Sequence, residues 1–362
     1  NIHTIARICN PDYTDQVYKM QKTFALSLTV NPEKQAAIEI ERLLKFPGFL
    51  KRDSFAKGRV EIVELRVDER SRLCNVALSE MNRVIKCRVL VCAVLRRGDV
   101  VAPDGSFVLR EGDRIFVTAS TESLATLLDN LGIITKKVNH VMICGGGRVS
   151  YYLAQQLEKD GITVRLIEKD PKHCEELAAL LPKTEIINDD ASNTFVLKRE
   201  NLESCDALVT ATGMDELNMI ISLYGTKHGV SQVITKLGHM ENGSMIDQLP
   251  IGSTIWPKDL CCNGIVRYIR AMHNQTGAAV SVHSIADGKA EAIEFHVEEK
   301  KPYCDKPLKN MKVKQNILVA CITHGGVTEL PGGDSVIREG DTVVVVTTRN
   351  DIIYKLDDIF EA

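Results

Sequence analysis

The chain has 362 residues, of which 44% are hydrophobic and 26% are charged, and its formal net charge is −3. This balance argues against a general nucleic-acid binder, which would carry an excess of basic residues. The most apolar runs, VLVCAVL and TVVVVTT, have the length of buried strands and fall short of the roughly 18 residues that a membrane helix needs. We therefore expect a chain that is soluble as given and that acts at a membrane only through a partner.

An amphipathic helix is predicted near the start of the chain. The segment PEKQAAIEIERLLKF (32–46) begins with a proline and has apolar residues at helical spacing, which is typical of a packing or dimerisation helix. Short strands and turns follow over about residues 60–130, where PDG and EGD are turn signals. This second stretch indicates a small α+β domain.

Residues 140–236 alternate short apolar strands with helical patterns, beginning with HVMIC, SYYLAQQLEKDG and TVRLIE. Strands and helices that take turns, with short loops between them, indicate a parallel α/β sheet. A second amphipathic helix, PKDLCCNGIVRYIRAM (257–272), follows this sheet. A second run of short strands then covers about residues 290–360.

Much of the chain occurs twice. The segment APDGSFVLREGDRIFVTAST (102–121) returns as LPGGDSVIREGDTVVVVTTR (330–349), and HTIARICNPDY pairs with QVITKLGHMEN so that Arg7 lies opposite Lys236. The offsets of about 225–230 residues indicate a duplicated module of two domains, because a solenoid unit is only about 20–50 residues long. Applied to the second α/β domain, the offset places the start of the first copy before residue 1. We therefore expect an N-terminally truncated chain whose first copy lacks most of its nucleotide-binding half.

The predicted fold class is α/β, with a Rossmann-like parallel sheet and small α+β domains in a tandem duplicated module. The repeat divides the chain into four parts. These are a remnant of the first α/β domain with its linker helix (1–50), the first α+β domain (51–135), the second α/β domain with its linker helix (136–275) and the second α+β domain (276–362).

The segment HVMICGGGRVSYYLAQQLEKDG (140–161) fits a strand, a glycine turn and a helix. Gly145 would allow the tight turn, and Gly147 would let the backbone approach a pyrophosphate on the helix N-terminus. Ser150 replaces the third glycine of G-x-G-x-x-G and is still small enough for close helix–strand packing. Glu168 ends the next strand, where a carboxylate accepts hydrogen bonds from ribose hydroxyls and repels a 2′-phosphate. This context predicts NAD or an adenine nucleotide rather than NADP, although a glycine turn also occurs for structural reasons alone.

Further candidates follow the other strands, each with a structural alternative. Arg148 suits a phosphate contact or a solvated surface position, and Asp190 suits an adenosine contact or a helix cap. Lys236 favours anion binding, because basic Arg7 holds the same place in the other copy. The segment TATGMDELN (210–218) lies at the carboxyl edge of the sheet, where ligands bind in such folds; its Asp215 and Glu216 also suit a helix start. The full candidate set for cofactor binding is Gly145, Gly147, Arg148, Glu168, Lys169, Asp190, Ala191, Thr210, Thr212, Glu216 and Lys236.

No catalytic apparatus is recognisable beside this motif. A dehydrogenase needs a second domain that brings a general acid or base to the nicotinamide, and His296 and His324 in the small domain are isolated in the sequence. No GxxxxGK[ST] loop is present. The eleven cysteines are scattered, without CxxC pairs or zinc-ligand spacing, and we interpret them as small hydrophobes of a reducing cytosol. We predict a protein that is not an enzyme and has no metal site.

The chain resembles the TrkA family, the cytosolic subunits of Trk-type potassium uptake systems, which are built from two tandem RCK (KTN) units. The resemblance covers essentially the whole chain. It is carried by VMICGGGRVSYYLAQQLE, VRLIEKDPKHCEELA, IINDDASN, LVTATGMDELNM, ARICNPDY and the twin REGD strands, each preceded by a C-[ND]-x-x-L segment. The tandem arrangement is its most specific part.

The resemblance implies that NAD or NADH, or alternatively ATP or ADP, binds the Rossmann-like half of each unit. It implies nucleotide contacts from Gly145, Gly147, Arg148, Glu168, Asp190, Thr212 and Lys236. The chain departs from the family pattern at Ser150 and at Lys236, where the family often has an arginine that would grip phosphate with two donors.

The resemblance also implies a membrane partner, a Trk-type potassium channel or transporter subunit. The chain would form a ring of RCK units, a homo-oligomer in the cytoplasm at the inner face of the membrane, and nucleotide occupancy would change the gate. Two alternatives remain open. The same modules could regulate another cation transporter, or the chain could be an NAD-dependent oxidoreductase whose catalytic groups are unrecognised.

Overall fold

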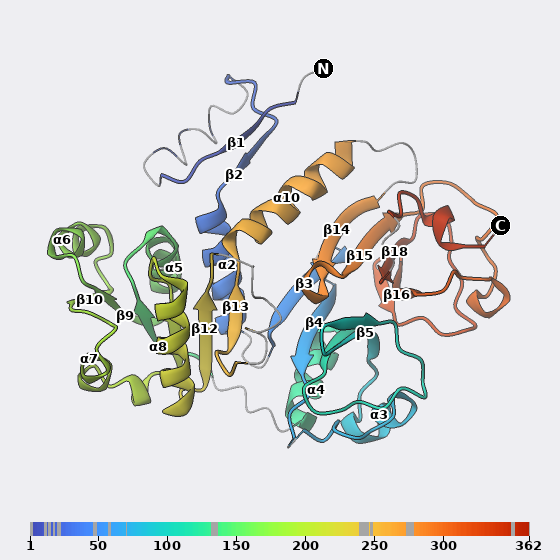
Figure 1. The fold of residues 1–362 in the computed structure, drawn as a ribbon. Helices are drawn as coiled ribbons and strands as arrows, with labels where there is room; N and C mark the ends of the chain where they lie inside the picture. Colours follow the sequence, from blue (N-terminus) through green and yellow to red (C-terminus); the bar gives the residue numbers. More distant parts are fainter. Residues whose placement is uncertain are drawn as a thin grey trace. The chain divides into compact units, whose positions relative to one another are not determined.

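The computed structural model describes residues 3–10, 13, 16, 19, 23–45, 49–56, 59–69, 71–131, 137–238, 246, 249–272, 279–348 and 352–361. The chain divides into two compact units, and each is assembled from two separate stretches of sequence. Unit 1 comprises Asn1–Pro47 and Thr135–Ile265, and unit 2 comprises Gly48–Ile134 and Val266–Ala362. Figure 1 shows both units, and helix α10 (Pro257–Met272) spans the boundary between them in the sequence.

A six-stranded parallel sheet forms the centre of unit 1, in the order β10-β9-β8-β11-β12-β13. This confirms the predicted Rossmann-like α/β fold. The sheet has one strand more than the sequence predicted, β13, because a strand of three residues shows no readable periodicity. The strands are β8 (His140–Cys144), β9 (Thr163–Glu168), β10 (Glu185–Asn188), β11 (Ala207–Thr210), β12 (Gln232–Lys236) and β13 (Ser253–Ile255).

Both faces of this sheet are covered, which explains why its strands are apolar without alternation. Successive side chains of a strand point to opposite faces. In β8, accordingly, Val141 and Ile143 belong to one hydrophobic core and Met142 and Cys144 to the other. The first core contains side chains of α5 and α6, and the second those of α7 and α8. The helices are α5 (Arg148–Lys159), α6 (Pro171–Leu180), α7 (Thr194–Arg199) and α8 (Asp215–Lys227).

The linker helix of the first copy, α2 (Pro32–Lys45), packs into the core of the second copy's α/β domain. Its buried side chains join those of α5 in one cluster, and Gln232 of β12 donates a hydrogen bond to the Leu43 carbonyl oxygen at 2.7 Å. Lys45 forms an ion pair of 2.9 Å with Asp160, at the end of α5. The predicted packing helix is therefore an integral part of unit 1. Its apolar contribution to the core is Ala36, Ala37, Ile40, Leu43 and Leu44.

The duplication is visible in strand register. Strands β1 (Ile5–Arg7) and β2 (Leu28–Val30) pair in parallel with Arg7 opposite Val30. Strands β12 and β13 pair in parallel with Lys236 opposite Ile255. The basic residues that the sequence repeat aligns thus hold the same position in two equivalent strand pairs.

Unit 2 contains two five-stranded antiparallel sheets with the same connectivity, β3-β4-β7-β5-β6 and β14-β15-β18-β16-β17. The small α+β domains are therefore two copies of one fold, as the repeat predicted. Copy one has α3 (Leu78–Ile85) and α4 (Thr121–Leu131), whereas copy two has short 3₁₀ helices at Leu308–Asn310 and Leu356–Ile359. The strands are β3 (Lys51–Phe55), β4 (Val60–Arg66), β5 (Leu90–Arg96), β6 (Asp99–Val101), β7 (Arg114–Ser120), β14 (Ala279–Ile285), β15 (Ala290–His296), β16 (Ile317–His324), β17 (Val327–Glu329) and β18 (Thr342–Thr347).

The two small domains share a core. In β4, Val63 and Leu65 belong to the core of copy one, while Ile62 faces a cluster that also contains Ala292 of β15 and Val344 of β18. Each sheet thus buries one face within its own domain and the other against its duplicate. The division of the chain into four domains stays a prediction.

Candidate functional site

The glycine turn that follows β8 has a conformation that its first residue dictates. Gly145 has φ of +98°, and a Cβ atom there would lie 2.8 Å from the Cα atom of Thr212. Only glycine accommodates this combination of a left-handed backbone and contact with another loop. Gly147 differs: its φ is −62°, and the nearest atom to an added Cβ would be the Ala211 carbonyl oxygen at 3.9 Å. Gly147, at the exposed N-terminus of α5, therefore has room for a small side chain at ordinary contact distance.

Glu168, at the end of β9, ties the glycine turn to the neighbouring strand. One carboxylate oxygen accepts a hydrogen bond from the Gly146 N–H at 2.7 Å, and the other accepts one from the Asp170 N–H at 2.9 Å. Each carboxylate oxygen has two lone pairs. The side chain can therefore hold the turn and still accept a hydrogen bond from a ribose hydroxyl.

His173, on α6, contacts this turn and was not predicted from the sequence as a site residue. Its Nε2 atom lies 2.9 Å from the Gly146 carbonyl oxygen, and its Nδ1 atom lies 3.1 Å from a carboxylate oxygen of Glu176. The spacing of His173 and Glu176, one helical turn apart, is the only signal in the sequence that could have pointed to it.

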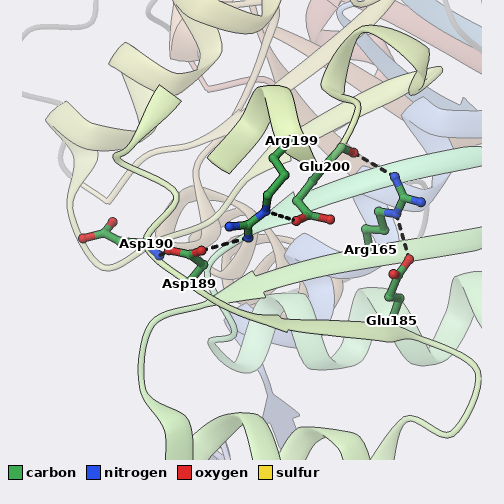
Figure 2. Close-up of polar contacts among 6 residues, drawn as sticks. All are labelled: Arg165, Glu185, Asp189, Asp190, Arg199 and Glu200. Atoms are coloured by element: carbon green, nitrogen blue, oxygen red, sulfur yellow. Dashed lines mark hydrogen bonds and ion pairs between the residues drawn. The ribbon is translucent and has the colours of Figure 1, made fainter. Parts of the chain in front are cut away.

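The loop after β10 presents Asp190 to solvent (Figure 2). Asp190 accepts a hydrogen bond from the Ser192 N–H at 2.8 Å, and this bond lowers the pKa of Asp190, with a further contribution from the charge of Lys169. Helix α7 is capped by Asn193, whose side chain accepts from the Phe195 N–H at 3.0 Å. The helix-cap alternative for Asp190 is therefore wrong.

Two arginines hold this loop in place, as Figure 2 shows. Arg199 forms ion pairs with Asp189 at 2.9 Å and with Glu200 at 2.8 Å, while Asp189 also accepts the Asp190 N–H at 2.8 Å. Arg165 of β9 pairs with Glu185 of β10 at 2.7 Å. It also donates to the Glu200 carbonyl oxygen at 2.7 Å. Arg199 thus anchors Asp189, the neighbour of Asp190, from the end of α7, and Arg165 links β9 to β10 and to the residue after α7.

Lys236, at the end of β12, is half-buried and bonded to the loop after β11. Its Nζ atom donates to the Thr212 carbonyl oxygen at 2.6 Å. Burial lowers the pKa of Lys236, and the charges of Asp215 and Glu33 act in the opposite direction. Because an ammonium group has three donors, this hydrogen bond leaves two for an anion.

The Thr212 loop is ordered by Asn218 of α8. The Asn218 amide oxygen accepts from the Thr212 N–H at 2.9 Å and from its hydroxyl at 2.7 Å. Asp215 accepts the Gly238 N–H with both carboxylate oxygens at 2.9 Å, while Glu216 is exposed in the first turn of α8. The loops after β11 and β12 are therefore joined by several polar contacts.

One expectation for this edge is wrong. Thr210 does not line a cleft, because its side chain is fully buried and its hydroxyl lies 2.9 Å from that of Ser222 in the core. Ala191 is likewise buried in the core beneath α7 and α8, whereas Arg148 and Lys169 are exposed. Ser150 is fully buried on α5, as close helix–strand packing requires.

The remaining candidates gather at the carboxyl edge of the sheet. Gly145 contacts Thr212, which accepts from Lys236, and Glu168 holds the residue that follows Gly145. The Asp189 N–H donates to the Glu168 carbonyl oxygen at 3.0 Å and so links the Asp190 loop to the same group. The glycine turn, the Glu168 carboxylate and the half-buried Lys236 ammonium group are thus connected.

Among the residues that the structure describes, no helix is both long and apolar enough to cross a lipid bilayer. No group of three His, Cys, Asp or Glu side chains among those residues has an arrangement suited to a metal ion.

Comparison with known families and proteins agrees with this architecture. The TrkA-N domain model matches residues 141–257, and the TrkA-C domain model matches residues 62–132 and 292–360. The Trk system potassium uptake protein TrkA homolog 1 of Methanosarcina mazei is 27% identical over 343 residues, which cover 94% of this chain and 75% of that protein. The Trk system potassium uptake protein TrkA of Haemophilus influenzae is 27% identical over 365 residues, which cover 99% of this chain and 78% of that protein.

Solved structures share the fold. The GsuK RCK domain superposes with a TM-score of 0.55 at 14% identity and covers 95% of this chain and 72% of that one. A GsuK channel bound to NAD superposes with a TM-score of 0.52 at 14% identity and covers 95% of this chain and 60% of that one. With one TrkA-N match, two TrkA-C matches and relatives that align over almost its whole length, the chain belongs to the TrkA family.

Proposed function

We propose that the chain is a regulatory subunit of a potassium uptake system, which binds NAD(H) or an adenine nucleotide and thereby gates a membrane potassium channel or transporter subunit. The observation that supports the ligand assignment is the exposure of Gly147 at the N-terminus of α5, beside a glycine turn held by Glu168. The names of the relatives, Trk system potassium uptake proteins, support the transport role.

In this proposal, each part of the nucleotide has a partner in the site. The N–H groups at the start of α5 would bind the pyrophosphate, Glu168 would accept from the ribose hydroxyls, and Asp190 would contact the adenosine half. Lys236, and Arg148 from the start of α5, would neutralise phosphate charge. The carboxylate of Glu168 would repel a 2′-phosphate, so NAD(H) is favoured over NADP(H), with ATP or ADP as alternatives.

The nucleotide acts here as a switch and not as a substrate. A ligand that binds two conformations with different affinity shifts the balance between them without any bond being broken. Phosphate groups that draw the Lys236 Nζ atom away from the Thr212 carbonyl oxygen would alter the link between the ends of β11 and β12. Rings of such units, in the cytoplasm at the inner face of the membrane, would pass this change to the membrane partner.

Gly147→Asp tests the ligand assignment. The new carboxylate would lie beside the bound pyrophosphate, and a like charge in such a position costs several kcal/mol. We expect the Kd for NAD to rise by about 100-fold or more. Calorimetric titration and thermal shift with NAD, NADH, NADP, ATP and ADP measure this, because a ligand that binds only the folded state raises the melting temperature.

The matched control is Gly332→Asp in unit 2, where an added Cβ meets no atom within 4 Å. It should leave both nucleotide affinity and melting temperature close to those of the wild type. A wild-type chain that binds none of the five nucleotides would show that the glycine turn is purely structural. Turnover of NADH with a panel of carbonyl compounds would favour the oxidoreductase instead.

A further inference from the structure

We propose that His173 is a positioning residue of the nucleotide site, and that its protonated form holds the glycine turn in the geometry that binds phosphate. Nucleotide affinity then falls as the pH rises through neutrality. This inference rests on the proposed nucleotide binding and adds to it a proton as a second regulator of the same site.

The two contacts of the imidazole ring require two protons. The Gly146 carbonyl oxygen, 2.9 Å from Nε2, and the Glu176 carboxylate, 3.1 Å from Nδ1, are both acceptors. A neutral imidazole has a single N–H and can donate to one of them only, whereas the imidazolium donates to both. Both contacts can therefore be hydrogen bonds at once only when His173 is protonated.

The charges around the ring favour that form. Glu176 projects from the same helix, Glu168 comes from the end of β9, and the carboxylate of Asp170 caps α6 by accepting the His173 backbone N–H. The pKa of His173 is raised, chiefly by the hydrogen bond to Glu176, with further contributions from the Gly146 carbonyl and the charge of Glu168, while partial burial acts against them. Arg148 is exposed at the start of α5.

His173 and Glu168 bind the two backbone groups of one residue, Gly146. Glu168 accepts the Gly146 N–H, and His173 donates to the Gly146 carbonyl oxygen. The following residue, Gly147, is the N-cap of α5, whose first N–H groups would bind the phosphates. Deprotonation of His173 removes one of its two hydrogen bonds, weakens the support of this turn and removes a positive charge close to it.

The sign of the effect follows from the direction of the pKa shift. A histidine whose pKa is raised on folding stabilises the folded state below its unfolded pKa, and this contribution is lost as the pH rises through the folded value. A bound pyrophosphate would favour the protonated form further. Nucleotide binding should therefore be accompanied by proton uptake near neutral pH.

Calorimetry of the full chain with NAD measures this directly. Titrations at about pH 6 and about pH 8.5, in buffers of different ionisation enthalpy, give both the Kd and the number of protons taken up. We expect the wild-type Kd to rise by roughly three- to tenfold between these values. His173→Gln keeps one amide donor for Gly146 but cannot be protonated, so its Kd should be nearly constant over the same interval.

The control is His228→Gln, at the end of α8, whose ring pairs with Glu203 at 2.9 Å. It should keep the pH dependence of the wild type. A His173→Gln chain that retains the wild-type dependence would overturn the role of His173 while nucleotide binding stands. A wild-type chain that binds no NAD at either pH would contradict both proposals, so the two failures are distinguishable.

Discussion

Gly145→Ala should lower the free energy of unfolding of unit 1 by about 3 kcal/mol or more, whereas Gly147→Ala should change it very little. The first substitution forces a left-handed backbone on alanine, at a cost of roughly 1–2 kcal/mol. It also places a methyl carbon 2.8 Å from the Thr212 backbone, and such overpacking costs about 1–3 kcal/mol more. The second substitution occurs at an ordinary φ, and its methyl carbon would lie 3.9 Å from the Ala211 carbonyl oxygen, an ordinary contact distance.

The single tryptophan makes this comparison measurable. Trp256 lies between β13 and α10 and packs with the side chains of unit 1. Its fluorescence in a urea titration therefore reports the unfolding of that unit. A Gly145→Ala chain as stable as Gly147→Ala would show that the turn does not need its left-handed conformation.

The same pair of variants separates folding from binding. Gly147→Ala should still weaken NAD binding by about tenfold or more, because a methyl group would fill the space that the pyrophosphate is expected to approach. Unchanged affinity in this folded variant would move the phosphate site away from Gly147.

Arg96→Met should destabilise unit 2 by about 3–5 kcal/mol. Asp113, in the first REGD segment, is buried, and Arg96 donates to both of its carboxylate oxygens at 2.8 and 2.7 Å. The Arg110 N–H also donates to this carboxylate at 2.8 Å. Removal of the arginine leaves a buried carboxylate with backbone donors alone, and an uncompensated buried charge carries this large cost.

Thermal unfolding followed by circular dichroism, or hydrogen exchange along β5 and β7, measures the loss in unit 2. Lys309→Met is the surface control, because the Lys309–Asp334 ion pair is largely exposed and should contribute no more than about 1 kcal/mol. The double variant Arg96→Met/Asp113→Leu should recover much of the free energy of unfolding that Arg96→Met loses, because it removes the buried charge as well. A double variant no more stable than Arg96→Met would show that the packing of the arginine matters more than the buried charge.

The alternation of apolar strands and helices, together with the repeat, was sufficient to predict the fold class and the duplicated module. The position of Thr210 could also have been deduced. Thr210 is two residues from Leu208, so both side chains point to the face that α8 covers. The expectation that Thr210 faces a ligand relied on its distance along the strand and ignored its direction.

Other features depend on contacts that no local pattern contains. The contact between His173 and Gly146 forms only because α6 packs beside the glycine turn, and the two residues are 27 positions apart in the sequence. The surface on which α2 packs could not be predicted either, because an amphipathic stripe indicates which face of a helix is buried but not which part of the protein covers it. Glu168 was predicted from its spacing to the turn, but its hydrogen bond to the Gly146 N–H was not.

The position of α2 has a consequence for how such duplicated proteins evolve. Five apolar side chains that precede the first α+β domain complete the interior of an α/β domain encoded a hundred residues later. A mutation that disrupts the linker helix of the first copy therefore destabilises the α/β domain of the second copy. Selection therefore acts on the two copies together. Deletion of either copy by recombination would expose, on the copy that is left, the apolar surface that the other copy buries.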